Sequence, residues 1–499
     1  MGKDQNVIII GAGIGGLTTS IRLALKGFNV TVLEKNSHPG GRCGHFAKDG
    51  HRFDTGATFM MMPEVYRKTY SSFGKDITSE LDLHQSDPIY RVKFNNGTDI
   101  KFTPDLSDLQ QQLEGIEPGS YNTFLKLLHQ GHKAYRLAMK HVIDHNYTSY
   151  FDKDMPRQLY ILFRFKAFVN HYKYISRKFR NDALRDLFTF QNLYLGQNPR
   201  NSSGIFFFMP FMELTSGVYY PKGGMHQIIK NIVDIAGETG VDIRLNTPVS
   251  EIRVNKGKAE GVVINDGTFL PADIVIANAD LPYVYNKLIP QSRKARKINK
   301  MKYACSAISY HWGVDTVFSG LEQHNVFVSD NHKETFDTIF KKKRLPDEPA
   351  IYVHSPVRSD PSAAPEGHDS MSAIVHVGHV DGQTAEEWQE MKQNAREIII
   401  KRLEEEGLKD FEKHIKFEIC HTPPDFQSEF NLTRGAVFGS LAHNVMQMAY
   451  FRPGNRHDKY KNLYFVGGST QPGGGMPLSL LSAKLVSERI MKNFGNQKN

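Results

Sequence analysis

The stretch VIIIGAGIGG, residues 7–16, decides the fold of this chain. A short apolar run leads directly into three glycines with the spacing Gly-x-Gly-x-x-Gly, which are Gly11, Gly13 and Gly16. In a strand–turn–helix unit the first glycine permits the tight turn, the second lets a pyrophosphate approach the backbone, and the third lets the helix pack closely on the sheet. The phosphates would lie at the N-terminus of that helix. The stretch therefore predicts a dinucleotide site, although glycine clusters also occur in ordinary turns.

Glu34 strengthens this prediction. A second apolar run, VTVL at residues 30–33, ends at Glu34, which follows Gly11 by 34 − 11 = 23 residues. A carboxylate at this spacing can accept hydrogen bonds from both ribose hydroxyls, and it would repel a 2′-phosphate. A strand–turn–helix unit without a ligand would explain the glycines, but it would not explain Glu34 at this spacing.

Length and composition narrow the class of protein. A chain of 499 residues can form two or three domains, and its excess of Lys and Arg over Asp and Glu, 62 − 53 = 9, makes the surface basic overall. Cys43, Cys305 and Cys420 are too widely spaced for a disulfide framework or a zinc site, so we expect no metal. His129 and His132 are better explained as a solvated helix face.

The chain shows no uninterrupted apolar segment of about 18 residues, the usual minimum for a membrane-spanning helix. Its first strand begins within six residues, which leaves no room for a secretory signal. We therefore expect a cytoplasmic protein that lies peripherally on a membrane if it meets one.

The pattern along the chain predicts two α/β portions separated by insertions. Alternating residues around 86–103 predict a hairpin, residues 105–200 are mostly helical in pattern, and α/β character returns after Pro221. A long amphipathic helix is expected near 385–406.

A glycine-rich turn near the C-terminus forms a second strong motif. The buried strand pattern of residues 462–466 runs into the turn 467–475, and a helix is expected from 478 to 493. Such a turn exposes backbone N–H groups, so a phosphate or a flat ring can approach the main chain. Beside the N-terminal motif, a second cofactor contact is a better explanation than a simple loop.

Taken together, these motifs and GGR at 40–42 and DTG at 54–56 resemble the FAD-dependent carotenoid desaturases of the bacterial and fungal phytoene dehydrogenase type. YYPKGG at 219–224, SDPSAAP at 359–365 and NLTRG at 431–435 extend the resemblance over essentially the whole chain. Gln471 and Gly474 depart from the pattern of many members, which bears on substrate or step number more than on flavin binding.

The resemblance implies an α/β fold in which an inserted, membrane-associated α+β substrate domain interrupts a Rossmann-like FAD-binding domain, as in flavin amine oxidases. We assign 1–85, 215–300 and 455–499 to the FAD-binding domain. The substrate-binding domain takes 86–214 and 301–454, and its helical part at 105–200 would face the membrane. The residues implied to contact FAD are Gly11, Gly13, Gly16, Glu34, Lys35, Gly41, Arg42, Val249, Gly467, Gly468, Met476 and Pro477.

Two internal stretches suggest a lipid substrate. Residues 155–180 contain seven basic and seven Phe or Tyr residues and no acidic one, a composition that suits a helix in the lipid headgroup layer. Single-stranded nucleic acid and ordinary core packing are the alternatives, and we expect no nucleic-acid partner. The apolar run at 204–212 is either core or the wall of a lipid-accepting tunnel.

The resemblance implies that a C40 precursor such as phytoene, or a C30 one, loses a hydride to the flavin and a proton to a base. Glu213 is a candidate proton acceptor, with a structural, ion-paired glutamate as the alternative. Oxygen or a quinone would reoxidise the flavin. Competing hypotheses are a polyene isomerase or later-step carotenoid dehydrogenase, an amine oxidase, and a non-catalytic prenyl-lipid binding protein of the GDP dissociation inhibitor type.

Overall fold

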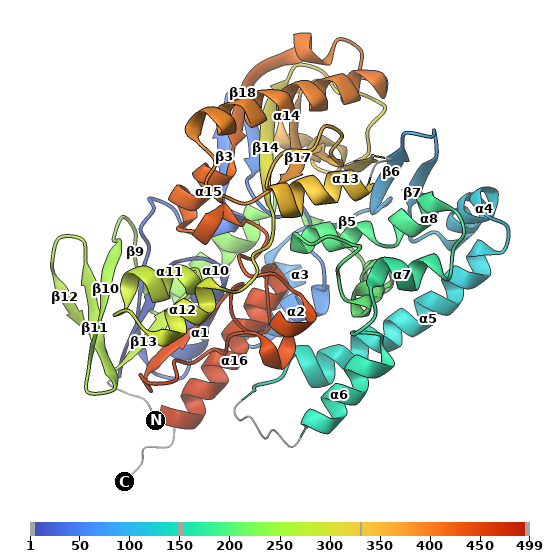
Figure 1. Cartoon of the computed structure of the whole chain (residues 1–499). Coiled ribbons are helices and arrows are strands. Elements are labelled where there is room, and N and C mark those ends of the chain that lie inside the picture. The colour runs from blue at the N-terminus through green and yellow to red at the C-terminus, as the bar shows by residue number, and fades with distance from the viewer. Residues whose placement is uncertain (1–4, 148–153, 330–331, 495–499) are drawn as a thin grey trace.

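The computed structural model describes residues 5–147, 154–329 and 332–494, and two large sheets organise it (Figure 1). The first sheet is parallel throughout, with the order β19-β13-β1-β2-β9. Its strands are β1 (Asn6–Ile10), β2 (Asn29–Leu33), β9 (Asp242–Arg244), β13 (Ile274–Ala277) and β19 (Leu463–Phe465). They come from the three segments that we assigned to the FAD-binding domain, whose boundaries stay a prediction.

Both faces of β1, β13 and β19 are buried, which explains the nearly continuous apolar sequences of these strands. Val7 and Ile9 pack into the core that contains α1 (Ile14–Ala24), α10 (His226–Glu238) and α16 (Met476–Phe494). Ile8 and Ile10 point the other way, into a second core beneath a small antiparallel sheet. That sheet consists of β10 (Val249–Asn255), β11 (Lys258–Ile264) and β12 (Phe269–Pro271). Successive side chains on a strand point to opposite faces, so a strand covered on both sides has no polar position.

The second large sheet is mixed and has the order β18-β14-β17-β16-β15-β6-β7. Its strands are β6 (Tyr90–Phe94), β7 (Asp99–Phe102), β14 (Ser306–Val314), β15 (His324–Val328), β16 (Ile351–His354), β17 (Asp369–Val377) and β18 (Ile415–His421). The long helix α14 (Ala385–Glu405) packs on one face, where Trp312 and Trp388 share a core. The predicted hairpin at 86–103 is confirmed as β6–β7, and it joins the sheet through a parallel pairing of β6 with β15.

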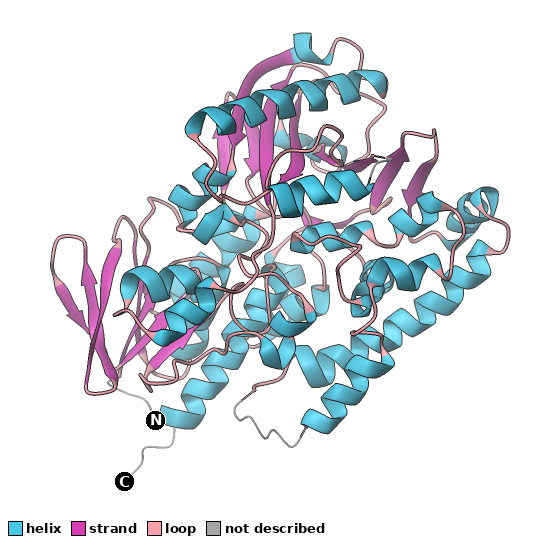
Figure 2. Cartoon of the chain, in the orientation of Figure 1, coloured by secondary structure: helices cyan, strands magenta, loops and turns pink. Residues whose placement is uncertain are grey.

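The described residues between 105 and 200 are mostly helical, as predicted, and these helices lie together on the right of Figure 2. They are α4 (Leu106–Ile116), α5 (Ser120–Ala138), α6 (Met155–Arg164), α7 (His171–Ser176) and α8 (Asp182–Leu187), and α9 (Met209–Ser216) packs against α5. None of the helices in the described part of the chain combines the length and the apolar character needed to cross a bilayer.

Shorter elements connect these parts. Two small ribbons pair β3 (His45–Lys48) with β4 (His51–Asp54) and β5 (Leu83–Gln85) with β8 (Tyr219–Pro221). The remaining α-helices are α2 (Pro63–Ser71), α3 (Ile77–Glu80), α11 (Leu281–Tyr283), α12 (Arg293–Asn299), α13 (His332–Asp337) and α15 (Pro423–Phe430).

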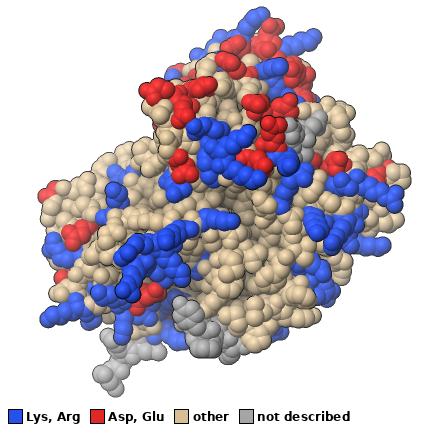
Figure 3. Space-filling view, viewed as in Figure 1, with Lys and Arg blue, Asp and Glu red and all other residues tan. Residues whose placement is uncertain are grey.

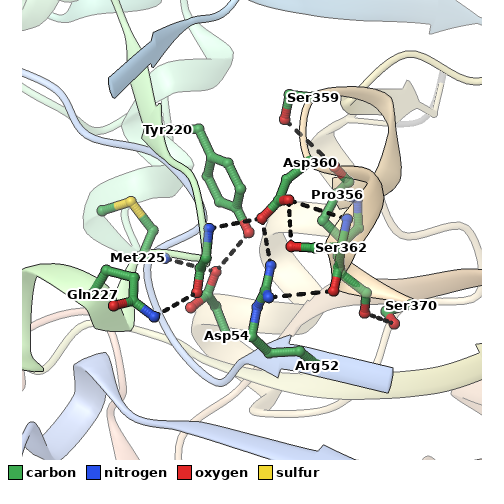
Figure 4. A network of polar contacts seen from close by, with 12 residues as sticks. Arg52, Asp54, Tyr220, Met225, Gln227, Pro356, Ser359, Asp360, Ser362 and Ser370 are labelled. Atoms are coloured by element: carbon green, nitrogen blue, oxygen red, sulfur yellow. Dashed lines mark hydrogen bonds and ion pairs between the residues drawn. The ribbon is translucent and has the colours of Figure 1, made fainter. Parts of the chain in front are cut away.

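A polar network joins three motifs that are far apart in the sequence (Figure 4). Arg52 Nη2 lies 2.6 Å from Asp360 Oδ2, and the Asp360 carboxylate also accepts the backbone N–H of Gly223 at 2.7 Å. Asp54 accepts the Tyr220 hydroxyl at 3.1 Å and the backbone N–H of Met225 at 3.0 Å. The motifs at 54–56, 219–224 and 359–365 therefore meet in one place and tie the β3–β4 ribbon to the mixed sheet.

Candidate functional site

One cavity of about 840 Å³ runs from the glycine turn after β1 into the helical part of the molecule. This volume lies near the upper end of the usual range for small-molecule sites. Most of the predicted cofactor residues line it: Gly11, Gly13, Glu34, Lys35, Gly41, Arg42, Val249, Gly467, Gly468, Met476 and Pro477. Gly16 and Glu213 are the two predicted site residues outside the lining.

The first glycine turn is too crowded for side chains. Gly11 has φ +98°, a left-handed conformation that favours glycine, and a Cβ there would lie 2.8 Å from the carbonyl oxygen of Asn278. A Cβ on Gly16 would lie 2.2 Å from the Gly11 carbonyl oxygen. Gly16 thus allows α1 to pack on the turn, and Gly11 and Gly13 leave the backbone open to the cavity.

Glu34 is held in place by the turn that it faces. Its Oε2 accepts the backbone N–H of Ala12 at 2.7 Å, and its Oε1 accepts the backbone N–H of Asn36 at 3.0 Å. The side chain is 6% exposed, so the carboxylate is oriented and borders the cavity. A carboxylate has about four acceptor positions, so two remain for ribose hydroxyls.

Arg42 supplies a positive charge to the wall of the cavity. Its Nη1 donates to the Val437 carbonyl oxygen at 2.8 Å, and its Nη2 lies beside Gly468. Burial lowers the pKa of Arg42, and the nearby Asp280 carboxylate opposes this shift. A guanidinium keeps its charge through such a shift, so it can neutralise a pyrophosphate.

Three polar residues near the two glycine turns were among the cavity residues missed by the sequence analysis. They are Asn278, whose Nδ2 donates to the Gly11 carbonyl oxygen at 3.0 Å, Asp280, and His443. His443 Nε2 accepts the backbone N–H of Gly474 at 3.0 Å and so holds the C-terminal glycine turn. Asn278 and Asp280 directly follow the apolar strand β13, a sequence signal that could have identified them as residues at a sheet edge.

The far part of the cavity is apolar. The run 204–212 was predicted to be either core or a tunnel wall, and its residues divide between these two places. Phe207 and Phe211 are core residues outside the lining. Five other members face the cavity, namely Ile205, Phe206, Phe208, Met209 and Met212. Tyr135, Phe190, Tyr194 and Tyr352 complete this wall. The cavity thus offers a long hydrocarbon a largely apolar surface.

Glu213 does not line the cavity. The side chain is 1% exposed, and its Oε2 accepts the Tyr90 hydroxyl at 3.0 Å. It makes no ion pair with any described residue, so the structure does not support the ion-paired alternative. Burial raises its pKa to about 8, against the opposing effect of the Tyr90 hydrogen bond. Glu213 is therefore mostly protonated at neutral pH, a state that does not suit a base, and its catalytic role stays a prediction.

The basic and aromatic stretch exposes apolar side chains on α6 and just after it. Leu159 is 44% exposed, Tyr160 64%, Phe163 75% and Phe168 57%. Leu162, also on α6, is buried and lines the cavity. On the face shown in Figure 3, acidic side chains gather mostly around α14, whereas the lower part is largely uncharged or basic.

These features fit FAD. The glycine turn, the oriented Glu34 carboxylate and the half-buried Arg42 guanidinium suit the adenine ribose and pyrophosphate of a dinucleotide. Glycine backbone at 467–468 and 474–475 also lines this cavity, where a flat ring could approach the main chain. Among the described residues no group of three His, Cys, Asp or Glu could hold a metal ion.

Comparisons with known proteins agree with this geometry. The family profile described as flavin containing amine oxidoreductase matches residues 14–491. A putrescine oxidase variant from a redesign of cofactor binding has the same fold, with a TM-score of 0.65 at 15% identity and 99% of each chain covered. The chain belongs to the flavin-containing amine oxidoreductase family, which confirms the predicted fold class.

Relatives of higher identity define the branch. The phytoene desaturase of Fusarium fujikuroi is 38% identical over 99% of this chain and 90% of its own length. The zeta-carotene-forming phytoene desaturase of Myxococcus xanthus is 39% identical, over 98% and 94%. The 4,4'-diapophytoene desaturase of Staphylococcus haemolyticus is 33% identical, over 99% and 100%. This chain is a flavin-dependent oxidoreductase of the phytoene desaturase type, as the sequence motifs predicted.

Proposed function

We propose that this protein is an FAD-dependent desaturase that introduces conjugated double bonds into a carotenoid precursor, either C40 phytoene or a C30 diapo-type molecule. One observation carries the proposal. A single cavity joins the dinucleotide cradle, which consists of the two glycine turns with Glu34 and Arg42, to a long apolar wall. A hydrocarbon offers no polar handle, so its binding free energy must come from buried apolar area, at roughly 25 cal/mol per Å².

When bound, the oxidised flavin would act as the two-electron oxidant. Arg42, Glu34 and the two glycine turns bind and orient the cofactor. The apolar walls align the hydrocarbon and keep water out. Oxygen or a quinone is the electron acceptor that we expect to restore the oxidised cofactor.

The test uses purified, FAD-supplemented protein with liposomes loaded with phytoene or diapophytoene, followed by chromatography of the polyenes. A product more unsaturated than its substrate supports the proposal, and the faster substrate assigns the chain length. If neither substrate gains a double bond, the desaturase assignment falls. A product that differs only in double-bond geometry would indicate an isomerase. A protein that binds no flavin would favour the prenyl-lipid binding alternative.

We further propose that the apolar residues around α6 dock on a membrane surface, so that the substrate enters directly from the bilayer. The exposed Phe163 lies next to Leu162 in sequence, and Leu162 lines the cavity. Arg157, Arg164 and Lys166 surround these residues with positive charge, which anionic headgroups attract.

Replacing Phe163 by Asp should reduce co-sedimentation with anionic liposomes several-fold while FAD binding is retained. The matched control is Leu106→Asp, because Leu106 is 42% exposed on α4 and away from the cavity lining. Equal sedimentation of wild type and Phe163→Asp, or an equal loss in Leu106→Asp, would contradict docking through α6.

A further inference from the structure

A histidine on the mixed sheet faces the cavity from its apolar side. His376 and Ile374 on β17 are half-buried and line the cavity, whereas their neighbours Val375 and Val377 are buried on the other face. This alternation follows from the period of two in a strand. His376 therefore presents an imidazole to the part of the cavity that suits a hydrocarbon.

The hydrogen bond of His376 determines which ring nitrogen is free. Its Nε2 lies 3.1 Å from the Leu193 carbonyl oxygen. A carbonyl oxygen only accepts, so Nε2 must carry the hydrogen and Nδ1 must keep its lone pair. Nδ1 has no hydrogen-bond partner among the described residues, and it is not buried away from the cavity. The ring stacks on Phe438, with centroids 4.8 Å apart, and this contact fixes its orientation.

The other histidine of the cavity has the opposite arrangement. His443 Nε2 accepts the backbone N–H of Gly474, so its lone pair is already used and its hydrogen is on Nδ1. Of the two described cavity histidines, His376 alone has a free basic nitrogen.

Each carboxylate of the cavity either already has hydrogen-bond partners or lies at the dinucleotide end. Both Glu34 oxygens hold backbone N–H groups at the cradle. Asp280 lies beside Arg42 and accepts the backbone N–H of Thr433 at 3.0 Å. Glu429 lies near Lys35, at the cradle end. The apolar wall contains no carboxylate among the described residues.

We propose that Nδ1 of His376 is the proton acceptor of the desaturation step, an inference that rests on the proposed function. One substrate carbon gives up a hydride, whose two electrons pass to the oxidised cofactor. The neighbouring C–H bond breaks, its electron pair becomes the new π bond, and its proton forms an N–H bond at Nδ1. The resulting imidazolium keeps its hydrogen bond from Nε2 to Leu193, and the proton then leaves to water.

The charge state of His376 agrees with this role. Burial lowers its pKa to about 4, and the hydrogen bond to Leu193 opposes part of this shift. The ring is therefore neutral near pH 7 and ready to accept a proton. A carbon next to a developing cation is a strong acid, so a weak base is sufficient.

The first test is His376→Gln, because a glutamine amide can still donate to the Leu193 carbonyl but has no basic nitrogen. We expect substrate-driven flavin reduction in a single anaerobic turnover to slow by roughly 10²- to 10⁴-fold, as for other lost acid–base groups. FAD affinity and Tm should stay near the wild-type values. The matched control is His311→Gln, because His311 is 2% exposed on β14 of the same sheet and does not line the cavity.

A reduction rate in His376→Gln within threefold of wild type would overturn the inference, as would an equal slowing in His311→Gln. If wild type itself desaturates neither phytoene nor diapophytoene, the proposed function fails instead. If wild type desaturates a substrate and His376→Gln does so at the same rate, the proposed function stands and only the role of His376 as proton acceptor fails.

The second test does not depend on activity. In protein labelled with ¹⁵N-histidine, the ring signals that disappear in His376→Gln belong to His376. At pH 7 we expect them to show hydrogen on Nε2 and none on Nδ1. Signals of the Nδ1–H tautomer or of an imidazolium would overturn the inference.

Discussion

Replacing Glu34 by Gln should weaken FAD binding by about 10- to 150-fold. Glu34 is 6% exposed and accepts the backbone N–H groups of Ala12 and Asn36 with its two oxygens. Glutamine turns an NH₂ group toward one of these donors, and a buried N–H without an acceptor costs roughly 1–3 kcal/mol of stability. It also takes away one charge-assisted hydrogen bond to the ribose, worth roughly 1.5–3 kcal/mol, which sets the loss in affinity.

The assay is a fluorescence titration of the cofactor-free protein with FAD, together with a thermal melt. Glu251→Gln is the matched control, because it makes the same charge change at an exposed position of β10, near Val249. A dissociation constant for Glu34→Gln within twofold of wild type would refute the ribose contact. An equal weakening in Glu251→Gln would show that net charge, and not the hydrogen bonds, controls the affinity.

Three further substitutions test the surrounding structure. Gly16→Ala should cost roughly 1–3 kcal/mol in denaturant unfolding through overpacking, whereas Gly237→Ala, with open space around its Cβ, should be neutral or slightly stabilising. Burial raises the pKa of Glu213 to about 8, so its contribution to stability falls as pH rises from about 5 to 8. The free energy of unfolding of Glu213→Gln should therefore rise, relative to wild type, by roughly 1.4 kcal/mol per pH unit in this window. A difference between the two proteins that does not change with pH would contradict the raised pKa. We also expect Glu213→Gln to keep its turnover, and a loss of turnover with FAD retained would restore Glu213 as the proton acceptor. Arg52→Met leaves the Asp360 carboxylate, which is 1% exposed, without its ion-pair partner and should lower the free energy of unfolding by on the order of 3 kcal/mol. Arg244→Met breaks an exposed pair with Asp242 and should lower it by about 1 kcal/mol or less. Equal losses would show that the buried pair stabilises the protein no more than the exposed one.

The cofactor end of the site could be predicted from the sequence because its determinants are local. The turn at 11–16 and the strand that ends at Glu34 belong to one β-α-β unit, and each residue type has a steric or hydrogen-bonding reason to be there. The C-terminal turn at 467–475 was also visible as a motif, and the parallel pairing of β13 with β19 places it beside the first turn.

The substrate end depends on contacts between distant segments, which a pattern in one segment does not show. The hairpin β6–β7 was predicted, but its pairing with β15, more than 200 residues later, was not. His376 belongs to an alternating strand like any other, and its free nitrogen follows only from the Leu193 carbonyl on another element. In the same way, DTG at 54–56 was visible as a motif, but the contacts of Asp54 with Tyr220 and Met225 join distant segments and could not be predicted from it.

Anaerobic mixing of the FAD-loaded protein with phytoene- or diapophytoene-loaded liposomes tests the central claim most directly. The account predicts that the visible absorption of the oxidised flavin is lost while one new double bond forms for each flavin reduced. An oxidised flavin spectrum that persists with both substrates, in protein shown to bind FAD, would contradict it.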